Sequence, residues 1–215
     1  MTQIPRTART KLHRAPTRGS YDREAVYAAI DAAIVGHIGY AIDETPYVTP
    51  TAVWRDGDHV YWHAADSGRM AQHLADGTAV CVTVTHFDGL VLARSAFHHS
   101  VNYRSVMAFG LVERVDALPT KMDALERFID RLYPDRWQAV RRPDEAELAR
   151  TSVFRLALDE AVCKARSGPP VDDDADLSLE VWAGTVPVER RFGAPVDAPD
   201  LEVAISPGAV GDALN

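Results

Sequence analysis

The sequence predicts a mainly β fold with peripheral helices, in which six or seven strands form a closed or half-closed barrel. The first reason is that short runs of alternating apolar residues recur in hairpin order, separated by turn signals such as Asp56-Gly57. The second is that the chain lacks the strand-helix alternation and the Gly-rich fingerprint of parallel dinucleotide-binding sheets. Closing the sheet into a barrel removes the exposed edges that a flat sheet would leave.

The bulk composition is that of one globular domain. The chain has 215 residues, of which 47% are apolar and 25% charged, which is enough for one sizeable core. Its net charge of -8 argues against nucleic-acid binding, which usually shows a basic patch. No run approaches the ~20 apolar residues of a membrane helix, and the basic N-terminus lacks the apolar stretch of a secretory signal. We therefore expect a soluble, cytoplasmic protein that does not bind membranes.

Three regions are predicted along the chain: an irregular arm at 1–20, a barrel domain at 21–166, and a linker with a tail at 167–215. The arm carries five basic residues with little apolar periodicity, which indicates a solvated segment or a phosphate contact (Arg6, Arg9, Lys11, Arg14 and Arg18). Ser167-Gly168-Pro169-Pro170 and the acidic run 172–174 mark the linker. We expect the tail to pack on the barrel or on a partner subunit, with an irregular conformation from Gly193 onward.

Within the barrel domain, the pattern predicts a helix from Ser20 and then a meander of strands at 34–42, 47–54 and 58–63. A short helix at 67–74 leads to a strand at 79–87, and Asp88-Gly89 predicts a turn into two strands, 89–96 and 101–115, joined by a His-His-Ser corner. Helices at 120–133 and 144–150 and one long strand at 152–164 follow. Cys81 and Cys163 lie in apolar runs, which favours buried free thiols and leaves a disulfide as the alternative.

The segment 101–115 carries the strongest alternation. Asn102 and Arg104 are expected on one face, and Tyr103, Met107 and Phe109 on the other, because side chains alternate along a strand. We expect the face with Met107 and Phe109 to be the buried one. Such a strand suits a barrel wall with a ligand at one end, and the alternative is a sheet edge with solvated polar residues.

Two local motifs are candidate ligand contacts. Ser67-Gly68-Arg69 follows a strand and begins a helix, so a hydroxyl and a guanidinium could hold a phosphate there; the alternative is a capping serine beside a solvated arginine. In Val48-Thr49-Pro50-Thr51-Ala52, the proline cannot donate to a β ladder, so the segment is expected to be an edge or to bend away from its neighbour. The backbone groups freed there could bind a planar heterocycle.

The histidines do not form a zinc motif. His98 and His99 are adjacent and would point to opposite faces of a strand, and His59 and His63 would be roughly 13 Å apart at the strand rise. A single histidine as a haem ligand or substrate contact stays open, and the candidates are His37, His63, His98 and His99. No metal site and no nucleophilic triad are predicted.

Several stretches resemble the pyridoxamine 5′-phosphate oxidase-related family, and in particular its flavin-nucleotide-binding branch that includes the nitroimidazole-resistance proteins. They are VTPTAVW, DGDHVYWHAADSGRM, the run DGLVLARSAFHHSVNYRSV and the late GPPVDDDADLSLEVWAGTVPV. The resemblance covers roughly residues 9–190. It implies an FMN-binding split β-barrel and a homodimer with flavins at its interface.

The resemblance also implies the roles of individual residues. Thr49, Thr51 and Ala52, on the strand that contains Pro50, would lie along the isoalloxazine ring. The remaining positions would flank the ribityl chain (His63, Ala64), hold the phosphate (Ser67, Arg69), lie by the cofactor or dimer seam (Asn102, Tyr103, Arg104), or reach the flavin of the partner subunit (Trp182).

Function is expected to follow from the bound flavin. The resemblance implies an FMN-dependent oxidoreductase acting on a small molecule such as a nitro-aromatic, with haem or a deazaflavin as alternative cofactors. A non-catalytic flavin- or haem-binding or redox-sensing protein is the alternative function. The chain has Ser-Gly-Arg where the oxidases proper have Ser-Arg-Lys, and their C-terminal substrate motif is absent, so oxidation of pyridoxamine phosphate itself is not expected.

Overall fold

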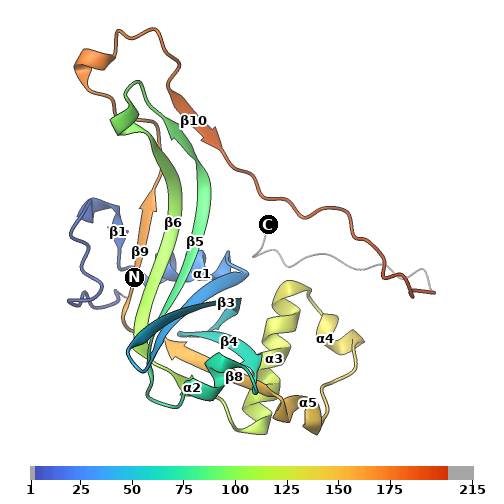
Figure 1. The fold of residues 1–215 in the computed structure, drawn as a ribbon. Coiled ribbons are helices and arrows are strands. Elements are labelled where there is room, and N and C mark those ends of the chain that lie inside the picture. The colour runs from blue at the N-terminus through green and yellow to red at the C-terminus, as the bar shows by residue number, and fades with distance from the viewer. Residues whose placement is uncertain (1–2, 203–215) are drawn as a thin grey trace.

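The computed structural model describes residues 3–202 and shows a ten-stranded antiparallel sheet that curls into a split barrel, so the predicted mainly β fold is confirmed (Figure 1). The strand order is β1-β9-β6-β5-β2-β3-β4-β8-β7, with β10 paired to β5. The bounds of the strands are β1 Gly19–Ser20, β2 Val35–Ile42, β3 Thr45–Asp56, β4 His59–Ala65, β5 Ala79–Leu92, β6 Ser100–Leu111, β7 Glu113–Arg114, β8 Thr151–Ala157, β9 Ala161–Arg166 and β10 Gly184–Pro187.

The helices lie around the barrel. Their bounds are α1 Arg23–Asp31, α2 Arg69–His73, α3 Leu118–Leu132, α4 Arg136–Ala139 and α5 Glu145–Ala149, with 3-10 turns η1 Pro16–Arg18, η2 Ala96–His98 and η3 Asp174–Asp176. Figure 1 shows α3, α4 and α5 gathered on the side of β4 and β8, while the β5–β6 hairpin rises away from them. Among the described residues, no helix is long and apolar enough to cross a membrane.

The barrel interior is filled by the inward residues of its strands. Val82 and Val106 are buried, and the Trp62 and Phe154 rings stack with centroids 5.8 Å apart. A second, smaller core lies between the sheet and α3, where Trp54 and Ala124 are buried. The sheet is therefore covered on both sides where α3 crosses it.

The predicted turn at Asp88-Gly89 is wrong. β5 continues from Ala79 to Leu92 through a bulge between Phe87 and Gly89, and pairs with β6 along its whole length. The glycine serves packing against β10, because a Cβ at Gly89 would lie 2.6 Å from the carbonyl oxygen of Val186. The chain reverses at η2, next to the predicted His-His-Ser corner.

Two further expectations are corrected. The single strand predicted at 152–164 is two strands, β8 and β9, which lie in different parts of the sheet and are joined by a short turn. On β6 the buried face is the one that begins with Asn102 and Arg104, because it continues into Val106 and Ala108 at 1% exposure. Met107, on the opposite face, is 42% exposed. Small side chains fill the narrow barrel interior here, while the large Met107 lies outside.

The N-terminal arm and the strand β10 both lie against the barrel sheet. Ile4 of the N-terminal arm is buried, Arg9 forms an ion pair with Glu160, and β1 pairs with β9. On the other side, β10 pairs with β5, and the tail then runs away from the barrel (Figure 1). The part of the predicted irregular tail beyond residue 202 lies outside the described residues. Both cysteines are free thiols.

Candidate functional site

The barrel opens between β3 and β4. Residues 45–52 of β3 pair with β2 alone, and only the stretch from Val53 to Asp56 pairs with β4. β4 in turn continues from His63 to Ala65 with β8 as its partner. The prediction that the Pro50 segment forms an edge is thus confirmed. It creates the split that gives the barrel its form.

Most of the sequence-predicted site residues meet at this split. Thr49 bonds the Tyr40 hydroxyl at 3.1 Å, and Thr51 Oγ1 donates to the backbone carbonyl of His63 at 3.2 Å. The Arg69 guanidinium lies 5.2 Å from the Tyr47 ring centroid, so the start of α2 faces the same β3 edge. The residues brought together are Thr49, Pro50, Thr51, Ala52, Ala64, Ser67, Arg69 and the backbone of His63.

The Ser67–Arg69 corner is open to solvent. Gly68, not Ser67, is the N-cap of α2, and no side chain caps this helix, so the capping reading of Ser67 is wrong. Both Ser67 and Arg69 are exposed. The hydroxyl and the guanidinium are therefore accessible to a ligand that enters the split.

The remaining predicted residues lie elsewhere in the chain. Arg104 forms an ion pair with Asp88 at 2.9 Å, and the Asn102 amide donates to the carbonyl of Gly168 at 3.2 Å. Both lie on the part of β6 toward the hairpin tip, as Tyr103 does, beyond the stretch of β5 that pairs with β2. Trp182 is 63% exposed and precedes β10. Within one chain, these four residues do not reach the split.

The outer face of the sheet beside the split carries several apolar side chains that no described residue covers. The strand register aligns Met107, Thr83, His37 and Pro50 in one row across β6, β5, β2 and β3. Val35 and Val48 flank this row at 51% and 66% exposure. Contiguous exposed apolar surface of this kind marks binding to another molecule.

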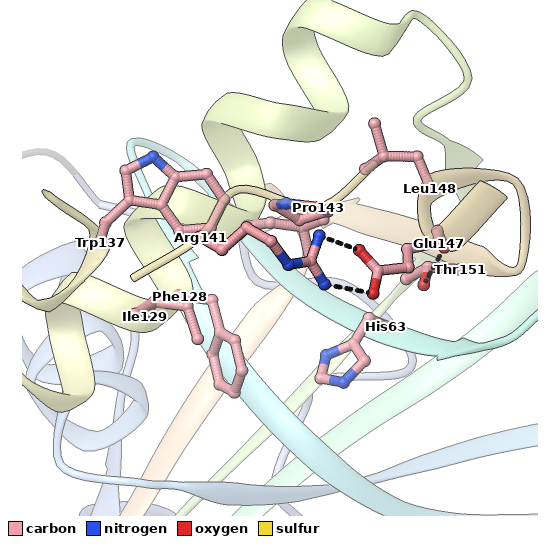
Figure 2. Close-up of a pocket in the computed structure, with 10 residues that line it drawn as sticks. His63, Phe128, Ile129, Trp137, Arg141, Pro143, Glu147, Leu148 and Thr151 are labelled. Atoms are coloured by element: carbon pink, nitrogen blue, oxygen red, sulfur yellow. Dashed lines mark hydrogen bonds and ion pairs between the residues drawn. The ribbon is translucent and has the colours of Figure 1, made fainter. Parts of the chain in front are cut away.

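A separate, open cavity lies between the sheet and the helices. It measures about 400 Å³ and is formed by β4, β8, α3, α4 and α5. Figure 2 shows Phe128 beside His63, with Arg141 and Glu147 above them. The lining is mostly apolar or aromatic: His63, Leu125, Phe128, Ile129, Trp137, Arg141, Pro143, Glu147, Leu148 and Thr151.

His63 is the histidine that lines this cavity. Its imidazole lies 5.2 Å from the Phe128 ring and 6.0 Å from the Trp54 ring. Nδ1 is buried and has no hydrogen-bond partner among the described residues. Burial lowers the pKa of His63 below its ordinary 6.5, so the ring is neutral near pH 7 and keeps a lone pair for a ligand. The imidazole therefore faces α3, away from the split to which the sequence assigned it.

An ion pair lies at the rim of the cavity. The Arg141 guanidinium donates to Glu147 at 2.7 and 3.0 Å, and the backbone N–H of Asp144 donates to the same carboxylate at 2.9 Å. These donors lower the pKa of Glu147 to about 2. Glu147 and Asp144 also form the capping box of α5, so the rim is part of the helix start.

This cavity escaped sequence reasoning because its parts are far apart in the chain. The 120–133 helix was predicted from its apolar stripe, but α4 with Trp137 carries no periodic signal. Within residues 3–202, no group of three or more His, Cys, Asp or Glu residues could hold a bare metal ion. One neutral imidazole in an apolar cavity suits a metal that brings its other ligands with it, as in haem.

Comparisons with known proteins agree with this architecture. The family model described as pyridoxamine 5′-phosphate oxidase matches residues 22–165, and no curated protein sequence matches. The flavocytochrome Anf3 from Azotobacter vinelandii is 36% identical, with TM-score 0.88, covering 97% of this chain and 95% of that one. The FAD and haem binding protein from Mycobacterium smegmatis is 32% identical, with TM-score 0.84, covering 88% and 94%.

A more distant structure shows the fold alone. It is assigned to 5-nitroimidazole antibiotic resistance in Bacteroides thetaiotaomicron, is 21% identical with TM-score 0.56, and covers 68% of this chain and 85% of that one. The family match spans more than half of this sequence and includes both the split and His63. The chain belongs to the pyridoxamine 5′-phosphate oxidase family.

Proposed function

We propose that this protein is a flavin-dependent oxidoreductase that also binds haem. The observation that carries the haem assignment is His63, which lines a largely apolar cavity and whose Nδ1 has no hydrogen-bond partner among the described residues. Two relatives above 30% identity, described as a flavocytochrome and as a FAD and haem binding protein, support the pairing of both cofactors. FMN is the leading flavin from the sequence, and FAD is the one that the second relative names.

The residues of the cavity fit a haem. His63 would be the axial ligand, since its neutral ring nitrogen can bind iron. Phe128 and Trp137 supply flat apolar surface for the macrocycle. Arg141 at the rim is placed to pair with a propionate, which would then compete with Glu147 for the guanidinium.

The split fits a flavin. The backbone of β3 next to Pro50 has free hydrogen-bonding groups on its unpaired side, and Thr49 and Thr51 border it. The Arg69 guanidinium and the Ser67 hydroxyl would bind the phosphate. When bound, the flavin supplies the redox chemistry, and this chain's residues orient it and exclude water.

We infer that the flavin site is completed by a second copy of the chain. The apolar outer face with Val35, Val48 and Met107 adjoins the split and needs a cover. The tail offers exposed apolar side chains on both sides of β10, the strand that pairs with β5. Val181 and Trp182 precede β10 and Phe192 follows it, and all three are at least 48% exposed. A homodimer would bury both surfaces.

The substrate proposed is a small electron acceptor such as a nitro-aromatic, with a reduced nicotinamide as the electron donor. The test is the visible spectrum of the purified protein, recorded before and after anaerobic addition of NADPH or NADH. A two-band flavin absorption with a Soret band, and bleaching of the flavin by a nicotinamide, is the expected result. A flavin that neither nicotinamide reduces would favour the non-catalytic binding function, and absence of both chromophores after addition of FMN, FAD and haemin would overturn the proposal.

A further inference from the structure

A second charged cavity lies between the N-terminal arm and the hairpin tip. It measures about 240 Å³ and is lined by residues from three segments far apart in the sequence. Arg14 and Arg18 come from the arm around η1, Phe97 and its neighbours from η2, and Arg166 from the end of β9. We call it the arm–tip pocket.

The positive charge of this pocket is not neutralised within the described chain. The Arg166 guanidinium is held by neutral acceptors: the amide oxygen of Asn102, and the carbonyls of Gly168 at 3.2 Å and Pro169 at 3.0 Å. Among residues 3–202, neither Arg14 nor Arg18 forms an ion pair. Three guanidinium groups thus converge on one cavity of a protein whose net charge is -8.

The nearby carboxylates are already engaged. Asp173 accepts from the His98 ring at 3.2 Å, and Asp172 forms an ion pair with Arg94 at 2.8 Å, its side chain only 2% exposed. These pairs hold the linker against the hairpin tip. They leave the arginines of the pocket free for an anion from solution.

The pocket also presents flat aromatic surface. Phe97 is 88% exposed, and its ring meets the His98 ring edge-on at 5.2 Å. A base stacked on this ring would remove it from water. Guanidinium groups that match phosphate oxygens beside a stacking surface are the chemistry that binds a nucleotide.

We propose that the arm–tip pocket binds the adenosine diphosphate moiety of a redox dinucleotide. Arg14, Arg18 and Arg166 bind the pyrophosphate, and Phe97 stacks on the base. Asn102 acts as a positioning residue, because it fixes Arg166. The moiety has two sources: the adenylate half of a flavin dinucleotide, or a nicotinamide dinucleotide that donates electrons. The identity of these two sources rests on the proposed function, whereas binding of ADP itself does not require a flavin.

The test is calorimetric titration of ADP into the full chain, with adenosine and inorganic phosphate as separate probes. We expect saturable ADP binding that is tighter than binding of either probe. The double variant Arg14→Gln/Arg18→Gln should weaken it about 100-fold, at roughly tenfold for each lost charge-assisted contact. The matched control is Arg6→Gln/Lys11→Gln, which removes the same charge from the same arm outside the pocket and should bind ADP as the wild type does.

The two sources are separated by comparing the FMN-loaded with the FAD-loaded protein. ADP binding to the FMN form alone assigns the pocket to the flavin's own adenylate half, and binding to both forms assigns it to a nicotinamide dinucleotide. No ADP binding in either form, or equal loss in the pocket variant and the control, would overturn the inference. If the protein takes no flavin at all, titration of the flavin-free chain still decides the inference, while the proposed function fails.

Discussion

The His63 cavity and the split between β3 and β4 lie on neighbouring strands but differ in how they are built. All the residues that line the cavity come from one chain, because α3, α4 and α5 pack beside β4 and β8. The split is bordered by the same sheet, yet the apolar side chains on its outer face are exposed in the part of the chain that the structure describes. In the proposed function, the lining of the first site comes from a single subunit, whereas the second site is completed by a second copy of the chain.

This difference has a physical origin in the insertion after β7. Where the chain leaves the sheet at 115–150, its helices bury Trp54 and the His63 ring and leave one imidazole nitrogen without a partner. Where the chain stays in the sheet, at β2 and β3, no helix follows, and Val48 remains in solvent. An unpartnered imidazole beside a cavity is a candidate ligand of a bound group, while exposed apolar side chains beside a split are candidate contacts with a protein partner.

The largest expected effect is on haem affinity and comes from removing the imidazole of His63, which lines the cavity and not the split. His63→Ala should lower haem affinity by more than about 100-fold, because even loss of an outer-shell partner costs metal sites 10- to 100-fold. Flavin content should stay at the wild-type level, because the imidazole faces α3. Haem and flavin are quantified from the spectrum of each purified variant.

His13→Ala is the matched control for this variant, since His13 is exposed on the arm. It should keep both chromophores. Equal haem content in His63→Ala and His13→Ala would show that the cavity does not hold the haem.

The next largest effect is expected from a substitution that prevents the proposed dimer from forming and leaves the His63 cavity unchanged. Val48→Asp places a charge on the apolar outer face, and an unpaired buried charge costs about 3–5 kcal/mol. The dimer should dissociate at least about 100-fold more readily and lose flavin, while haem stays bound. Light scattering coupled to size exclusion measures the mass, with the spectrum recorded on the same sample.

Leu118→Asp is the control for the outer face, since Leu118 is 53% exposed at the start of α3, away from β2 and β3. It should remain dimeric. A Val48→Asp protein that stays dimeric with full flavin would contradict the idea that the split is completed by a second copy.

A smaller effect, on the flavin dissociation constant, tests whether Arg69 binds the flavin phosphate in the split. Arg69→Gln removes one charge-assisted phosphate contact, which is expected to raise the flavin dissociation constant by about 10- to 100-fold. Haem content should not change. Flavin fluorescence on release reports the constant, with the exposed Arg136→Gln as the control. Unchanged flavin affinity would remove Arg69 from the phosphate site.

Much of the fold followed from local patterns, whereas the cavity did not. The alternation in β2 to β4, the Asp56-Gly57 hairpin and the proline in β3 are short-range signals, and they predicted the sheet and its split edge. Asp88-Gly89 looked like a turn because the close approach of β10, nearly a hundred residues later, cannot be seen locally. Met107 was expected to be buried because a single sequence shows that a residue is apolar, not which molecule covers it.

His63 shows the same limit at the level of the site. Its position at the end of a strand was visible, and it was one of four candidate haem ligands. Its burial depends on Phe128 and Trp54, which approach it from α3 and β3. Likewise, the arm's arginines could be read as a phosphate contact, but their meeting with Arg166 depends on the fold.

The smallest expected effect is on the free energy of unfolding, through Glu147 at the rim of the His63 cavity. Glu147 has an ordinary pKa of 4.5, and Arg141 with the Asp144 backbone lowers it to about 2 in the folded protein. Since the folded pKa is depressed, the carboxylate contributes stability that is fully present above pH 4.5 and is lost as the pH falls toward 2.

Glu147→Gln keeps a residue able to close the capping box but removes the charge. Urea unfolding should therefore show the variant as less stable at pH 6 and the two proteins converging near pH 2. A stability difference that is constant across this range would mean that Glu147 acts through its shape and its cap, and that Arg141 is already free to meet an anionic group of a ligand.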